Sequence, residues 1–126
     1  AFAQKIPYAS IMNQRGELVE PTAESISAAA SGVIPTDTRT SITNADAAGA
    51  YPIATFTWMI IYKEQNYSDR SKEQATATLN LLQYILSDEA QKITSEVHYA
   101  PLPAKAKELS LKNLKTVTYD GMPILQ

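Results

Sequence analysis

The longest run of strand-forming residues extends from Ile53 to Tyr62, and it contains neither glycine nor proline. Side chains of a strand alternate between two faces, and in this run both faces would be largely apolar. A strand of that kind belongs inside a sheet that is covered on both sides, as in an α/β protein. Pro52 lacks a backbone donor and fits the entry to the strand. The pattern therefore predicts a central β-strand over residues 51–62, with flanking helices.

A β-hairpin is predicted near the start of the chain. Residues 6–12 alternate in the manner of a strand, residues 13–16 form a turn, and residues 17–20 bring the chain back. Gly16 suits the turn because glycine adopts a positive φ without steric cost. A second short strand is indicated at 116–119, before the turn-forming pair at 120–121.

Capping residues and apolar spacing predict four helices. Thr22 is a suitable N-cap for a short helix of small residues, Ser68 for a long helix that begins at Asp69, and Ser87 for the helix after it. Pro103 suits the first turn of the last helix. The expected ranges are 23–30, 69 to about 86, 88 to about 97, and 104 to about 114. Residues 1–5 are interpreted as the last turn of a further helix.

Apolar positions at helical spacing mark the faces that these helices should bury. The expected buried positions are Ala75, Leu79, Leu82, Ile85 and Leu86 in the long helix, Ala90, Ile93 and Val97 in the next, and Ala106 and Leu109 in the last. Between the first helix and the central strand, residues 33–50 are rich in Thr, Asp, Asn and Gly and show little periodicity. They predict a long loop, and long loops of compact domains are usually functional or mobile.

Composition narrows the possible functions. The chain has 126 residues, of which 44% are hydrophobic and 19% charged, and a formal net charge of −2 with scattered Lys and Arg. This argues against a nucleic-acid surface or electrostatic docking on an anionic membrane, because both need a cluster of positive charge. The chain has no cysteine, which excludes disulfides, Cys-ligated metals and thiol nucleophiles. No apolar run approaches the length that spans a bilayer.

Few residues could carry chemistry. His98 is the only histidine and follows a predicted helix, where capping or packing explains it better than catalysis. Asp37 and Asp46 lie in the long loop, and nothing in the sequence pairs them as a general acid and base, so we interpret them as turn residues. Thr22 precedes free helix N–H groups that could bind an anion, but the neighbouring Glu24 would repel it, and an ordinary cap is the better interpretation.

Three blocks in order resemble the periplasmic phosphate-binding proteins of ABC transporters. The first is Pro7-Tyr-Ala-Ser-Ile-Met-Asn13 with Gly16 and Val19-Glu-Pro-Thr-Ala-Glu-Ser-Ile26. The second is the apolar run from Tyr51-Pro-Ile to the pair Tyr62-Lys63. The third is a helix pair that closes with Val97-His-Tyr-Ala-Pro-Leu-Pro103. Together they cover roughly residues 1–108, and the tail from Leu109 is not distinctive.

The resemblance implies an α/β chain that is part of a two-lobed periplasmic-binding-protein fold (type II-like), with the central strand and its flanking helices. It implies only the C-terminal portion: residues 1–50 would end the second lobe and contain the crossover loop, and residues 51–126 would return into the first lobe. In this family the elements that grip phosphate lie further toward the N-terminus. No catalytic, ligand-binding or metal residue is therefore assigned to this chain, and no cofactor is expected.

The function implied by the resemblance is non-enzymatic binding of phosphate, or a similar tetrahedral oxyanion, by closure of two lobes for uptake by an ABC transporter. The expected partners are the missing N-terminal half, inorganic phosphate and the transporter's membrane subunits, without nucleic acid, in the periplasm or outside the cell. A stand-alone interaction or structural module that has lost ligand binding is the alternative, because a fold does not fix a function. A phosphatase-like enzyme is a third possibility, and no nucleophile–base pair supports it.

Overall fold

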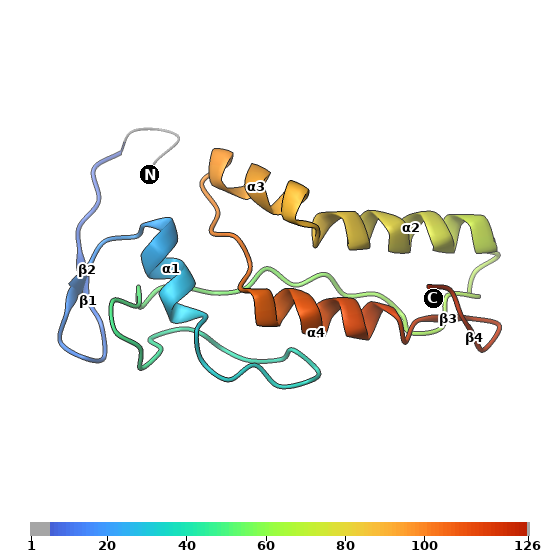
Figure 1. Ribbon diagram of the computed structural model, residues 1–126, viewed down its shortest axis with the longest axis horizontal. Helices are drawn as coiled ribbons and strands as arrows, with labels where there is room; N and C mark the ends of the chain where they lie inside the picture. Colours follow the sequence, from blue (N-terminus) through green and yellow to red (C-terminus); the bar gives the residue numbers. More distant parts are fainter. Residues whose placement is uncertain (1–5, 126) are drawn as a thin grey trace.

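A computed structural model describes residues 6–125 of the chain, with the elements arranged in two groups along an elongated molecule (Figure 1). One group holds α1 and the β1–β2 hairpin, and the other holds α2, α4 and the β3–β4 hairpin. The helices are α1 (Ala23–Ala29), α2 (Lys72–Ile85), α3 (Asp88–Glu96) and α4 (Ala104–Leu114). The strands are β1 (Ile11–Met12), β2 (Leu18–Val19), β3 (Thr118–Tyr119) and β4 (Met122–Pro123). The helical turn expected at 1–5 lies outside the described residues.

The predicted N-terminal hairpin is confirmed, with shorter strands than expected. β1 and β2 are antiparallel, and Ile11 lies opposite Val19. Gly16 has a φ of 77° in the turn between them, a conformation that side chains with a Cβ resist. The turn residues therefore determine where this hairpin forms. Each of its two strands is only two residues long.

The buried Asn13 attaches this hairpin to the end of the long loop. Its Oδ1 accepts from the backbone N–H groups of Arg15 and Glu17, both at 3.0 Å. Its Nδ2 donates to the Ala50 carbonyl at 3.2 Å and to Glu17 Oε2 at 2.8 Å. The same carboxylate oxygen accepts from the Gly49 N–H at 2.8 Å, and the hydrogen bond from Asn13 is the main reason that the pKa of Glu17 lies below its usual value. The side-chain amide of Asn13 thus makes both the local hydrogen bonds of the turn and a hydrogen bond to Ala50, 37 residues away.

α1 and the long loop form the first apolar core. Thr22 caps α1 as predicted, and its hydroxyl accepts from the Ser25 N–H in a reciprocal capping box. The buried members of the core are mostly alanines, which let α1 and the loop approach closely. They are Ala29, Ala30, Ile42, Ala50 and Ala54. Residues 33–50 form no helix or strand, as predicted, but Ile42 and Ala50 anchor this segment firmly.

The second core lies between α2 and α4, which run side by side in Figure 1. Leu79 is fully buried there beside Leu114 and Val117, and Leu82 and Leu86 pack against them. The apolar stripe predicted for the long helix is confirmed at these positions, and Ala106 and Leu109 of α4 are buried as expected. Pro103 takes the N-cap position of α4, one residue before the place that the sequence suggested.

The start predicted for the long helix is wrong. Its N-cap is Ser71, whose side chain accepts from the Gln74 N–H, and the helix begins at Lys72. Ser68 and Asp69 have φ values of 50° and 56°, which place them in the left-handed region and outside any right-handed helix. Two serines three residues apart offer equivalent caps, and the tight turn before Arg70 selects the second one.

The face predicted to be buried in α3 is also wrong, although Ser87 caps this helix as expected. Ile93 and Val97 are exposed, and the buried residue is Gln91. Its Nε2 donates to the Ile85 carbonyl at 2.8 Å, and its Oε1 accepts from the Leu102 N–H at 2.7 Å. A polar side chain therefore joins α3 to the segment before α4, while the apolar side chains of α3 have no layer to cover them within the described part.

The predicted central strand is not present as a strand in the described residues. Residues 51–62 cross the molecule as a ribbon without regular structure, and only an isolated parallel bridge between Glu64 and Thr118 follows it (Figure 1). Met59, Ile60 and Tyr62 are 59%, 94% and 70% exposed. A strand needs neighbours for its backbone groups, and the remaining strands here are two-residue pieces engaged in their own hairpins. The expected α/β class holds only as a mixture of helices and small antiparallel sheets.

Candidate functional site

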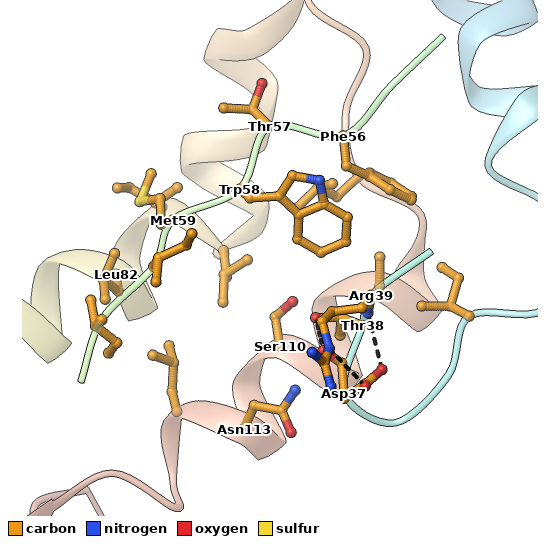
Figure 2. Close-up of a pocket in the computed structure, with 18 of the residues that line it drawn as sticks. Asp37, Thr38, Arg39, Phe56, Thr57, Trp58, Met59, Leu82, Ser110 and Asn113 are labelled. Carbon is orange, nitrogen blue, oxygen red and sulfur yellow. Dashed lines mark hydrogen bonds and ion pairs between the residues drawn. The ribbon is translucent and has the colours of Figure 1, made fainter. Parts of the chain in front are cut away.

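The described residues form an open groove of about 790 Å³. It is lined by loop residues between 34 and 40, by ribbon residues 56–61 with Lys63, by one face of α2, and by one face of α4 with residues just before and after that helix (Figure 2). The segments come from both halves of the chain. The ribbon spans the distance between the two cores, and no strand of the described residues lies along either of its edges.

The walls of the groove are mainly apolar. Phe56 and Trp58 project into it from the ribbon in an edge-to-face pair, with ring centroids 5.6 Å apart and an interplanar angle of 73° (Figure 2). Leu82 of α2 and Leu114 of α4 also line the groove. Trp58 remains 44% exposed, so that the groove leaves a large aromatic surface in contact with water.

A polar turn forms the opposite rim. Asp37 Oδ1 accepts from the Arg39 N–H at 3.1 Å and Oδ2 accepts from Arg39 Nε at 2.9 Å, while Thr38 between them has a φ of 60° (Figure 2). The backbone hydrogen bond from Arg39, followed by that from its guanidinium, holds the pKa of Asp37 below its usual value. Asn113 of α4 donates from Nδ2 to the Thr36 carbonyl at 3.0 Å and so fixes the rim to the helix.

This arrangement suits an apolar occupant better than a tetrahedral oxyanion. An oxyanion site needs convergent donors, and the one guanidinium at the rim is 85% exposed and already bonded to a carboxylate. Within the described range, no three His, Cys, Asp or Glu side chains gather in a way that could hold a metal ion. The groove therefore offers hydrophobic surface. Within the described residues, the backbone N–H and C=O groups of 57–61 beside it make no backbone–backbone hydrogen bond.

The residues considered from the sequence as candidates for chemistry do not converge. Asp37 pairs with Arg39, whereas Asp46 pairs with Arg15 at 3.2 Å, so that each acidic residue has its own partner and they form no dyad. His98 follows the C-cap of α3 with a φ of 62°, and its backbone N–H donates to the Ser95 carbonyl, which fits a residue that ends a helix. Thr22 is a helix cap, as expected.

Glu64 is an organising residue that sequence reasoning missed. Its carboxylate accepts from the backbone N–H groups of Asn66 at 2.9 Å, Asp120 at 3.0 Å and Gly121 at 3.1 Å, and from the Thr118 hydroxyl at 2.8 Å. These bonds, that from Asn66 first, lower the pKa of Glu64 to about 2. The carboxylate thus holds the turn of the β3–β4 hairpin against the end of the ribbon. Three of these partners lie 54 to 57 residues away, and the sequence indicated only the Asp-Gly turn at 120–121.

Glu64→Gln should remove part of the acid sensitivity of the fold. Because the folded pKa is depressed from 4.5 to about 2, the ionised carboxylate contributes stability above pH 4.5, and this contribution is lost as the pH falls toward 2. Thermal unfolding followed between pH 2 and 6 should show a shallower decline for the variant than for the wild type. The control is Glu108→Gln, which removes an exposed carboxylate paired with Lys105 at 3.2 Å and should keep the wild-type slope. Equal slopes for wild type and Glu64→Gln would contradict this role.

Comparison with known proteins identifies relatives. None of the protein-family models compared with the chain matches it. A phosphate-binding protein PstS of Methanocaldococcus jannaschii is 29% identical over 126 aligned residues, which cover 93% of this chain and 32% of that protein. PstS proteins from two strains of Xylella fastidiosa are 34% and 33% identical over 106 residues, which cover 82% of this chain and 28% of each.

The chain thus spans about a third of the length of the curated relatives that it matches. The resemblance to the PstS phosphate-binding proteins is therefore confirmed, and this chain is similar to a portion of such a protein.

Proposed function

We propose that this chain is the C-terminal portion of an extracytoplasmic solute-binding protein, which holds phosphate or a similar tetrahedral oxyanion between two lobes and delivers it to an ABC transporter. The observation that carries the proposal is the similarity to three phosphate-binding proteins over 82–93% of the chain. In this role the protein binds and releases its ligand without chemical change.

The apolar character of the groove supports the proposal that the phosphate ligands lie outside this chain. The described residues supply an apolar groove whose single rim guanidinium is occupied by Asp37. Donors for an oxyanion would then come from the part of the protein outside this chain.

Among residues 6–125, no helix combines the length and apolar character that crossing a bilayer requires.

The proposed division of the chain places residues 1–50 at the end of the second lobe and in the crossover, and residues 51–126 in the first lobe. Two observations support it. The core of α1 and the loop is separate from the core between α2 and α4, and the ribbon connects them. The loop touches both, because Ile42 packs in the first core while the Thr36 carbonyl accepts from Asn113 of α4.

Calorimetric titration with inorganic phosphate tests the proposal. The isolated chain should give no heat of tight binding. A chimera in which this chain replaces the matched segment of the Xylella fastidiosa PstS should bind phosphate, and sulfate in a parallel titration measures selectivity between oxyanions. Tight binding of phosphate by the isolated chain would contradict the proposal. A chimera that folds but binds neither anion would also contradict it, and would favour a stand-alone interaction module.

A further inference from the structure

We propose that the Asp120–Gly121 pair is a modification site, at which Asp120 converts to isoaspartate, and that the Glu64 carboxylate keeps this site closed in the folded chain. The modification is a rearrangement of the main chain that needs water and neither an enzyme nor a cofactor. The inference goes beyond oxyanion binding and does not depend on the proposed function, because it rests on hydrogen bonds within this chain.

The sequence offers this reaction at one place. The chain has four glycines, of which only Gly121 follows an aspartate and none follows an asparagine. Isomerisation is fastest before glycine, because a residue without a Cβ lets its nitrogen approach the carboxyl group of the preceding side chain. Both residues of the pair are exposed, and a Cβ added at Gly121 would meet nothing within 4 Å. Space around the turn therefore does not prevent a ring from forming.

The reaction balances without an oxidant or a reductant. The Gly121 nitrogen attacks Cγ of the protonated Asp120 side chain, a C–N bond forms, and the side-chain hydroxyl leaves with the amide proton as water. The product is a cyclic imide, a succinimide. Water then opens the ring. Addition at Cγ restores aspartate, whereas addition at the Asp120 main-chain carbonyl breaks its bond to the Gly121 nitrogen and gives isoaspartate, so that the main chain runs through the former side chain.

The first step requires the Gly121 nitrogen to turn toward the Asp120 side chain, and Glu64 opposes this rotation. Its Oε2 accepts from the Gly121 N–H at 3.1 Å, and its Oε1 accepts from the Asp120 N–H at 3.0 Å. The φ values of 51° and 74° at residues 120 and 121 fit the two-residue turn of a β-hairpin, in which Tyr119 lies opposite Met122. The bond to an ionised carboxylate also keeps the proton on the nitrogen that would attack.

The Asp120 side chain is held as well. Its Oδ1 accepts from the Asn66 side-chain amide, and the Asn66 backbone N–H donates to Glu64 at 2.9 Å. The Thr118 hydroxyl, which donates at 2.8 Å, fixes the Glu64 carboxylate in turn. The pKa of Glu64 is about 2, lowered chiefly by the hydrogen bond from Asn66, so this acceptor stays ionised at neutral and mildly acidic pH. Glu64 thus restrains the attacking nitrogen directly and the carboxyl group through Asn66.

Isomerisation would loosen the end of the chain from the second core. Isoaspartate lengthens the main chain by one methylene group, so that the turn no longer brings β4 into register with β3. The segment after β4 depends on this register, because the Ile124 N–H donates to the Val117 carbonyl at 3.1 Å. Ile124 and Leu125 pack against the core around Leu79. A slow covalent change in the turn would therefore weaken the α2–α4 core.

Incubation of the whole chain in ¹⁸O-labelled water at mildly acidic pH tests the site. Each opened succinimide incorporates one heavy oxygen, which mass spectrometry detects in the peptide that contains residues 120–121, and methylation by an isoaspartate methyltransferase counts the isoaspartate. A synthetic peptide of residues 117–123 gives the unrestrained rate. The wild type should isomerise at least about 10-fold more slowly than the peptide, and Glu64→Gln should be about 10-fold faster than the wild type, because hydrogen bonds to the ionised carboxylate limit local opening. Glu108→Gln is the control and should keep the wild-type rate.

Two further variants separate restraint by Glu64 from general unfolding. Leu79→Ala weakens the same core and removes no hydrogen bond of the turn. Each variant is compared with wild type brought to the same free energy of unfolding by urea, and Glu64→Gln should exceed that wild-type rate, whereas Leu79→Ala should equal it. Asn66→Ala gives a milder test at an exposed position, because it removes the donor to Asp120 and keeps the backbone donors of Glu64. Its rate should lie between those of wild type and Glu64→Gln.

Three results would overturn the inference. A wild-type rate equal to that of the peptide would show that the turn is not restrained. Equal rates for Glu64→Gln and Glu108→Gln would show that Glu64 is not the source of the restraint. Equal rates for Glu64→Gln and Leu79→Ala at one stability would assign the effect to unfolding. None of these results bears on phosphate binding, so the titration of the chimera remains a separate test of the proposed function.

Discussion

Leu79→Ala should destabilise the chain by about 2–5 kcal/mol. Leu79 is fully buried in α2, between Leu114 at the end of α4 and Val117 before β3. Truncation removes the central side chain of the second core and leaves a cavity, because helices held by several contacts collapse only partly around it. Since this core is small, the loss is a large fraction of the stability of this half.

Urea unfolding followed by far-ultraviolet circular dichroism measures this effect. Leu81→Ala is the matched control, because Leu81 lies in the same helix and is 57% exposed. The control should cost less than about 1 kcal/mol, since little apolar surface is removed from a buried environment. Equal midpoints for the two variants would mean that the α2–α4 core does not form as described.

Asn13→Ala should cost about 1–3 kcal/mol, a large loss for a polar side chain. The change removes the amide that accepts from Arg15 and Glu17 and donates to the Ala50 carbonyl. These partners are left with fewer hydrogen bonds in a site from which Asn13 excludes water, being only 5% exposed. The hairpin turn and the end of the loop should loosen together.

Hydrogen exchange of the Gly49 and Glu17 amides, together with the unfolding midpoint, measures this loosening. Gln14→Ala provides the control, because Gln14 is the exposed neighbour in the same turn. In this control variant, the Gly49 and Glu17 amides should exchange at the wild-type rate. If Asn13→Ala accelerated exchange only in the hairpin and left Gly49 unchanged, the connection between hairpin and loop would be disproved.

These two residues lie at different ends of the ribbon and stabilise different cores. Asn13 and the alanine-rich core hold the chain as it enters the ribbon at Tyr51, whose N–H donates to the Ser25 carbonyl at 2.9 Å. Leu79 and Ile61 hold it where it leaves. The ribbon is thus positioned at both ends, while residues 57–61 make no backbone–backbone hydrogen bond within the described part of the chain.

Most of the local structure could be predicted from the sequence. Thr22, Ser87 and Gly16 act as the cap, cap and turn residue that their types suggest, because a cap or a tight turn depends on a few neighbouring residues. The three residue blocks also indicated the family of phosphate-binding proteins to which the chain is similar. The apolar content of residues 51–62 predicted a central β-strand, which the described residues do not form.

Other features depended on contacts between distant segments. Glu64 meets a hairpin 54 to 57 residues away, and Gln91 meets Leu102, and neither partner is indicated by spacing in the chain. The choice of Ser71 over Ser68 followed from the turn that precedes the helix.

By itself the sequence determined the helices, the turns, the family that the chain resembles and the two-faced apolar character of residues 51–62. Only the tertiary structure decided that the described residues supply no strand to pair with this ribbon, that an apolar groove lies beside it and that the two cores are separate. The physical reason is the range of the interactions. Caps and turns satisfy their hydrogen bonds within a few residues, whereas a strand is completed only by partners that the rest of the fold brings to its edges.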